Sequence, residues 1–106
     1  RGWRGFPAMM YLIVLAPTPG AQIRARGDMQ SLLRANPDAE VELVINGKAV
    51  PEALASPDAD SDPYLVLCQN SLKAANLTAP EGFRTEAAAI EYIARRQMEG
   101  WAYLRA

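Results

Sequence analysis

Residues 9 to 16, MMYLIVLA, form an unbroken apolar run with an aromatic and β-branched centre. A strand covered on one face alternates apolar and polar residues, whereas a strand in a parallel sheet is covered on both faces and is apolar throughout. Residues 41 to 45 (VELVI) and 64 to 68 (YLVLC) are also predicted as strands. Two shorter strands are expected at residues 82 to 85 and 101 to 104. The sequence therefore predicts a mainly parallel sheet of about five strands.

Helical patterns lie between these strands. Apolar residues recur at helical spacing over residues 22 to 35, and short helices are predicted at residues 50 to 55 and 71 to 75. The last helix has a candidate N-cap at Thr85 and a candidate C-terminal stop at Gly100. Its predicted apolar stripe comprises Ile90, Ile93, Ala94, Gln97, Met98 and Trp101.

Strands that alternate with helices predict a three-layer α/β/α sandwich, in which helices cover both faces of the sheet. A chain of 106 residues suits one such domain. We assign the domain to residues 9–106 and interpret residues 1–8 as an N-terminal extension or an expression remnant. Right-handed crossovers place every loop that leads from a strand to a helix at one edge of the sheet, where open sheets bind ligands. Three loops are expected to meet there: residues 17 to 21, 47 to 50 and 68 to 71.

The composition excludes several kinds of chemistry. The chain has no histidine, so a Ser–His or Cys–His nucleophile pair is impossible within one chain, and its single cysteine can form no disulfide within the chain. A formal net charge of −1 lacks the excess of Lys and Arg that marks nucleic-acid binding. Residues 1 to 21 loosely resemble a secretory signal, but their apolar run is short and belongs to a predicted strand. We expect a cytoplasmic protein without a cofactor, a metal, a nucleic-acid partner or a membrane segment.

Cys68 ends the third predicted strand, and Gln69, Asn70 and Ser71 follow it. Free cysteine is among the most buried residue types, so an inert core thiol is one interpretation. The other interpretation depends on position, because unpaired N–H groups at the start of a helix favour the thiolate and lower the pKa of a cysteine from about 8.5. On this interpretation Cys68 lies at a rim, partly accessible, with the N–H groups of residues 69 to 72 turned towards it. Asn70 or Ser71 would then cap the helix.

Three other stretches are weaker candidates. The loop APTPGAQ, residues 16 to 22, follows the first strand as a phosphate loop would, but its prolines lack the N–H groups that bind phosphate. The aspartates at positions 58, 60 and 62 alternate as calcium ligands do, but the glutamate that would complete a calcium loop is missing. The arginines and aromatic residues between positions 94 and 106 are interpreted as the last helix and strand rather than a nucleic-acid patch.

The chain resembles the DsrE/DsrF-like family of small α/β proteins, which includes sulfur-relay subunits, in three stretches. These are VELVINGKAV at 41 to 50, CQNSL at 68 to 72 and RRQMEGWAYLRA at 95 to 106. The resemblance covers roughly residues 9 to 105. It implies a flavodoxin-like sandwich that assembles into homo- or hetero-oligomers, often trimers or hexamers. It also implies that a cysteine at the position of Cys68 carries a persulfide.

These observations together predict an intracellular sulfur carrier that holds a persulfide on Cys68 and exchanges it with sulfur donor and acceptor proteins. Such a sulfurtransferase-type exchange between sulfur atoms needs an accessible thiol of low pKa and no histidine. Gln69, Asn70 and Ser71 form the loop that is expected to support the thiol.

The alternative is a non-catalytic, oligomeric binding or accessory module of the same fold, with an inert Cys68. A homo-oligomer, a trimer or hexamer rather than a dimer, is expected in either case. Tyr92, Trp101 and Tyr103 present more aromatic surface than one short helix and strand can cover, and large apolar patches mark interfaces. A thiol reagent separates the two interpretations, because a buried thiol would be protected.

Overall fold

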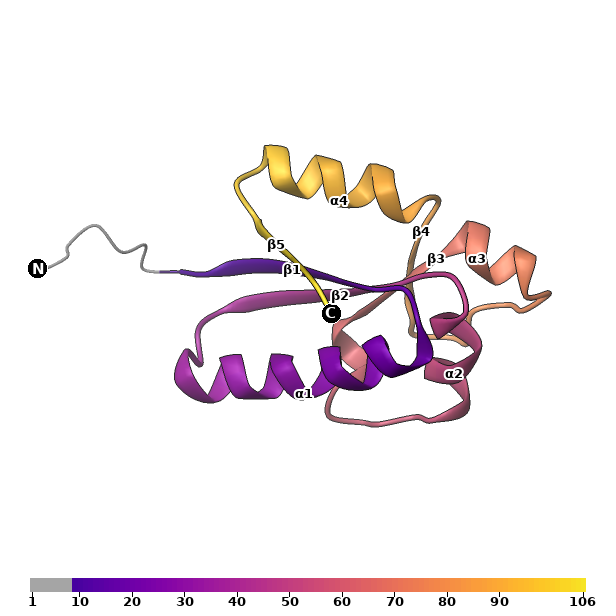
Figure 1. The fold of residues 1–106 in the computed structure, drawn as a ribbon, viewed down its shortest axis with the longest axis horizontal. Coiled ribbons are helices and arrows are strands. Elements are labelled where there is room, and N and C mark those ends of the chain that lie inside the picture. Colours follow the sequence, from indigo (N-terminus) through magenta and orange to yellow (C-terminus); the bar gives the residue numbers. More distant parts are fainter. Residues whose placement is uncertain (1–8) are drawn as a thin grey trace, which may run out of the picture.

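A computed structural model describes residues 9–106 as one α/β domain built on a five-stranded sheet (Figure 1). The sheet has the order β4-β3-β2-β1-β5, and every neighbouring pair of strands is parallel. The predicted three-layer, flavodoxin-like α/β/α sandwich is therefore confirmed. The interpretation of residues 1–8 lies outside the described residues. The strands are β1 (Tyr11–Ala16), β2 (Glu40–Ile45), β3 (Leu65–Cys68), β4 (Arg84–Glu86) and β5 (Ala102–Arg105).

The helices divide between the two faces of the sheet. The first three crossovers step in one direction, from β1 to β4, whereas the last one returns to the far side of β1. Because such crossovers are right-handed, a reversal of direction moves the connecting helix to the opposite face. Figure 1 shows α1 and α2 on one side of the sheet and α4 on the other. The helices are α1 (Pro19–Ala35), α2 (Ala49–Ala55), α3 (Gln69–Ala74) and α4 (Ala89–Met98), and a short 3-10 helix, η2 (Asp62–Tyr64), precedes β3.

Successive side chains of each strand serve the two faces in turn. Val14 of β1 and Leu43 of β2 pack with α1 and α2, whereas Ile13 and Val44 belong to the cluster beneath α4. This double coverage is why these strands are apolar on both faces. The second face depends on one helix, and its helical residues are Ala89, Tyr92 and Ile93.

Helix α1 begins earlier than predicted, at Pro19 rather than residue 22. Thr18 caps it, because its hydroxyl accepts the N–H of Ala21 at 3.2 Å. Pro19 stands at the first helical position, where a missing N–H costs nothing. The prolines after β1 thus start a helix as well as ending a strand.

Helix α4 differs from its prediction at its start and on its face. Thr85 lies in β4, so its predicted role as N-cap is wrong, and the helix begins at Ala89. Ile90 and Met98, both predicted in the apolar stripe, are 82% and 89% exposed. Tyr92 is buried instead, because a polar network described below pairs its hydroxyl. Gly100 ends the helical segment with a φ of +96°, which suits glycine and confirms the predicted stop.

None of the helices within residues 9–106 is both long enough and apolar enough to cross a membrane.

Candidate functional site

The three loops predicted to meet at the carboxyl edge of the sheet do so. The Gly47 N–H donates to the Ser71 hydroxyl at 2.8 Å, which joins the loop after β2 to the loop after β3. Gly47 also has a φ of +57°, and a Cβ atom there would come within 3.0 Å of the Pro17 carbonyl oxygen, in the loop after β1. A glycine is required at this crossing, because other residues rarely adopt positive φ and the space for a side chain is occupied.

Cys68 lies at the part of this edge where the loops after two neighbouring strands turn to opposite faces of the sheet. It ends β3 and is paired in register with Glu86, which ends the neighbouring strand β4. After β3 the chain enters α3, whose Leu72 packs into the cluster beneath α1 and α2; after β4 it enters α4 on the opposite face. Such a divergence of neighbouring loops opens the crevice in which parallel α/β sheets bind ligands. Cys68 therefore occupies the topological switch point of the sheet.

The side chain of Cys68 is buried, so its predicted partial accessibility is wrong. The residue is only 5% exposed and packs with Val66, Ala89 and Ile93. The physical reason is the position of α4, which begins at Ala89 and places its first turn over the end of β3.

Polar donors nevertheless converge on the thiol. Burial raises the pKa of Cys68, but four hydrogen bonds outweigh this effect and hold the pKa below its ordinary value. The donors are the Ser71 hydroxyl and the N–H groups of Ser71, Ala89 and Asn70. The Asn70 N–H is shared, because it also donates to the Ala87 carbonyl at 3.3 Å. A thiolate at this site is stabilised by fixed dipoles from two helices.

The supporting loop has a different arrangement from the one predicted. Helix α3 begins at Gln69, and Cys68 itself occupies the N-cap position with extended backbone angles, so neither Asn70 nor Ser71 is the cap. The Ser71 hydroxyl accepts from Gly47 and donates to the thiol. The side chain of Gln69 donates to the Thr85 hydroxyl at 2.9 Å and ties α3 to β4. Ala89 supplies an N–H that sequence reasoning missed, since it comes from a helix distant in the chain.

A second feature missed from the sequence is a buried carboxylate, Glu42, on the face covered by α4. The Tyr92 hydroxyl donates to one oxygen of Glu42 at 2.5 Å, and Arg84 and Arg96 each donate to the other at 2.9 Å. The Arg96 guanidinium also lies 4.4 Å from the centroid of the Trp101 ring. These contacts fix α4 on β2 and β4 and thereby position the Ala89 N–H over Cys68.

The charge of this cluster is compensated. Burial raises the pKa of Glu42, but hydrogen bonds from Arg96, Tyr92 and Arg84 more than offset it, so the pKa of the carboxyl lies below its ordinary value. Burial raises the pKa of Tyr92, which keeps the hydroxyl protonated as the donor. The only sign of this cluster in the sequence was an acidic residue inside an apolar strand.

Two of the aspartates at positions 58, 60 and 62 hold their loop in place. Asp58 accepts the Ser61 hydroxyl at 2.6 Å, and Asp62 pairs with the buried Arg26 at 2.7 Å. Residues 9–106 contain no group of three or more acidic, cysteine or histidine side chains that could hold a metal ion. The loop is a structural element, and Arg26 of α1 is the central hydrogen-bond donor that holds it.

Comparison with known proteins adds support for the fold. No family model matches the chain, and no curated protein matches it significantly. A solved structure from Methanobacterium thermoautotrophicum, described as a protein of unknown function, is similar to this chain with a TM-score of 0.75 and 22% sequence identity. The match covers 91% of this chain and 99% of the other. At this identity the likeness shows the fold alone, and the resemblance to the DsrE/DsrF-like family stays a prediction.

Proposed function

We propose that the protein is a sulfur carrier of the DsrE/DsrF-like type, in which Cys68 holds a persulfide. The observation that carries the proposal is the position of Cys68 at the switch point of the sheet, where donors of Ser71, Asn70 and Ala89 lower the pKa of its thiol in spite of burial. A cysteine that serves only as core packing has apolar neighbours, which raise the pKa of its thiol. Here backbone N–H groups from two helices and one hydroxyl meet at the sulfur instead.

The chemistry is a pair of exchanges between sulfur atoms. The Cys68 thiolate attacks the terminal sulfur of a donor persulfide R–S–SH, the donor S–S bond breaks, and R–S⁻ leaves while Cys68 becomes Cys–S–SH. An acceptor thiolate then attacks the terminal sulfur of Cys68, takes it as its own persulfide and restores the Cys68 thiolate. Neither step needs a base to remove a proton from carbon or oxygen, which is consistent with a chain that lacks histidine.

Burial has a role in this proposal. The hydrogen bonds of Ser71 and Ala89 stabilise an anion on the sulfur, and the surrounding side chains shield it from bulk solvent. Cys68 itself lines neither of two nearby surface clefts, but both clefts are lined by residues that lower the pKa of its thiol or adjoin them. One, of about 440 Å³, is lined by Asn70 and Ser71; the other, of about 400 Å³, is lined by Asn46 and Ala89.

Donor and acceptor proteins, a cytoplasmic location and a homo-oligomer belong to the same proposal. Tyr92, predicted to add aromatic surface for assembly, is buried and does not contribute to it. The surface formed by α4 and β5 still carries exposed apolar side chains, and it is the face we propose for assembly into a trimer or hexamer. The side chains proposed for the interface are Met98 and Leu104; Ile90 and Tyr103 are also exposed but line a neighbouring cleft.

The low exposure of Cys68 favours the second candidate function, an oligomeric binding or accessory module with an inert cysteine. Mass spectrometry separates the two. The protein is incubated with a low-molecular-weight persulfide and then with an excess of an acceptor thiol. A carrier gains one sulfur atom on Cys68 in the first step and loses it in the second, while Cys68→Ser gains none. A wild-type protein that takes up no sulfur supports the binding module.

A further inference from the structure

Asn46 contains the one buried side-chain polar atom within residues 9–106 that has no hydrogen-bond partner, its Oδ1. An unpaired buried acceptor costs free energy, so such an atom calls for an explanation. Asn46 follows β2 at the carboxyl edge of the sheet and lines the cleft of about 400 Å³ beneath α4. The residue that carries the orphan acceptor thus lines a surface cleft beside the candidate site, while its Oδ1 is buried behind the wall of that cleft.

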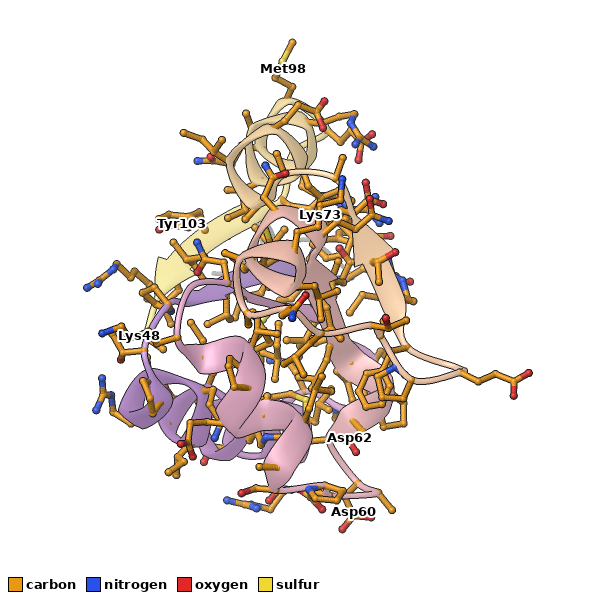
Figure 2. The ribbon with its side chains drawn as sticks, turned by 90° about the vertical axis from the view of Figure 1, so that its right-hand side faces the viewer. Lys48, Asp60, Asp62, Lys73, Met98 and Tyr103 are labelled. Atoms are coloured by element: carbon orange, nitrogen blue, oxygen red, sulfur yellow. The ribbon has the colours of Figure 1, made fainter. Side chains whose placement is uncertain are left out.

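The cleft is neutral and mainly apolar. Of its lining residues, only Tyr103 is ionisable. Figure 2, which faces the carboxyl edge, shows Tyr103 extending from β5 below α4. An apolar wall with one unpaired oxygen matches an uncharged molecule with an apolar body and a single N–H or O–H donor. The remaining lining residues are Leu15, Asn46, Ala89, Ile90, Ile93, Ala94 and Gln97.

The register of the sheet brings this cleft next to the thiol. Ile45 of β2 pairs with Leu67 of β3, so Asn46 and Cys68 follow at the same level on neighbouring strands. Neighbouring strands lie about 4.8 Å apart. Both side chains belong to the α4 face, because Asn46 lines the cleft with residues of α4 and Cys68 packs against Ala89 and Ile93.

We propose that this cleft binds the uncharged, apolar body of a small persulfide, whose N–H or O–H group pairs with Asn46 Oδ1 after a small shift of the side chain. The inference rests on the proposed function, since it supplies the substrate class for the same cysteine. Bound in this way, the donor directs its terminal sulfur towards Cys68 from the neighbouring strand. A small-molecule donor bound there lies against Ala89 and Ile93, which line the cleft and pack on Cys68, so it approaches the thiol without a second protein having to expose the sulfur.

The test uses two alkylating reagents and needs no persulfide. Iodoacetanilide has an aromatic ring and an amide N–H, whereas iodoacetamide has the same reactive carbon without the ring. Because Cys68 is the only cysteine, mass spectrometry reports its modification directly. We expect the ratio of the iodoacetanilide rate to the iodoacetamide rate to be about tenfold higher in native protein than in urea-unfolded protein.

Two variants connect the preference to the cleft. Asn46→Ala should lower the rate at which iodoacetanilide modifies the native protein by about fivefold, because the hydrogen bond to the seated reagent is lost. Ala94→Phe, at an exposed position of the lining, should abolish the preference by filling the cleft. Asn36→Ala, beyond the end of α1, is the matched control and should leave the ratio unchanged. Asn46→Ala should also keep or raise the free energy of unfolding, since Oδ1 makes no hydrogen bond within residues 9–106.

Equal ratios in native and unfolded protein would overturn the inference, as would a native thiol that reacts with neither reagent, or a preference that both cleft variants retain. The outcomes also separate this inference from the proposed function. If the protein prefers iodoacetanilide through the cleft but takes up no persulfide sulfur, the cleft is a small-molecule site and the carrier function is wrong. If Cys68 takes up sulfur from inorganic polysulfide but shows no preference for iodoacetanilide, the carrier function stands and the cleft is not its donor site.

Discussion

Ser71 joins two loops through one hydroxyl group. The group accepts the Gly47 N–H and donates to the Cys68 thiol, so it both orders the edge of the sheet and favours the thiolate. Ser71→Ala should therefore raise the pKa of Cys68, which shifts the pH profile of iodoacetamide alkylation to higher pH. Ser31→Ala, which removes an exposed hydroxyl on α1, is the control and should leave the profile in place. Superimposable profiles for Ser71→Ala and wild type would show that this hydroxyl does not tune the thiol.

Which residues touch the thiol was only partly predictable. The position of Cys68 at a strand end could be inferred, because a short apolar run stops there and polar residues follow. That Ser71 and not Asn70 contributes its side chain depends on helix α3 starting at Gln69. The Ala89 N–H depends on tertiary packing of α4, and no local pattern contains that information.

At the scale of elements, Gly47 is where the loops after β1, β2 and β3 cross. Gly47→Ala should lower the free energy of unfolding by about 1–2 kcal/mol, because an alanine at positive φ is strained. The contact of 3.0 Å with the Pro17 carbonyl adds to that cost. Gly27→Ala is the matched control with the opposite sign: this glycine lies inside α1 with free space around it, and alanine should add about 0.5–1 kcal/mol. Urea unfolding measures the free energy of unfolding of both variants. A Gly47→Ala variant as stable as wild type would contradict the close contact of the three loops at Gly47.

The Glu42 cluster connects β2, β4 and α4. Glu42→Leu leaves Arg84 and Arg96 without their common acceptor and the Tyr92 hydroxyl unpaired, which should cost about 3–5 kcal/mol in urea unfolding. The pKa of Glu42 is lowered in the folded state. The carboxylate therefore adds to the free energy of unfolding above its unfolded-state pKa, and this stabilisation is lost as pH falls through the folded-state value.

The control for Glu42 is Glu91→Gln. Glu91 pairs with Arg95 on the exposed surface of α4, where ion pairs contribute little, so its replacement should leave the free energy of unfolding nearly unchanged. A similarly small effect at both positions would mean that the cluster does not hold α4 in place. This cluster could not be predicted from the sequence, because a single glutamate in a strand suggests a solvent-facing position rather than a buried carboxylate.

Met98 is 89% exposed at the end of α4, on the face we propose as the interface. Met98→Glu should shift the protein towards smaller species in multi-angle light scattering, because it introduces a charge into an apolar contact. Ile23→Glu makes the same kind of change on α1, on the opposite face, and should leave the mass unchanged. A wild-type protein that is monomeric at micromolar concentration would contradict the proposal.

The overall architecture followed from strand patterns that are local in the sequence. Apolar runs such as residues 9 to 16 predict strands covered on both faces, and the handedness of crossovers then determines where the loops gather. The start and face of α4 could not be predicted in the same way. Tyr92 is buried because Glu42, fifty residues earlier, pairs its hydroxyl, and this contact moves the apolar stripe around the helix. Long-range polar contacts of this kind leave no periodic signal.

A persulfide carrier requires that Cys68 become a thiolate at a lower pH in the folded protein than in the unfolded chain. The direct measurement is an ultraviolet titration of the thiolate, with Cys68→Ser subtracted to remove the tyrosines. We predict that the native midpoint lies below the midpoint in urea, because the donors around the sulfur lower the pKa of Cys68 in the folded state. The free energy of unfolding relative to Cys68→Ser should then rise with pH between these two midpoints, since the unfolded chain binds the proton more tightly. A native midpoint at or above the unfolded one would contradict the account and identify Cys68 as an inert core residue.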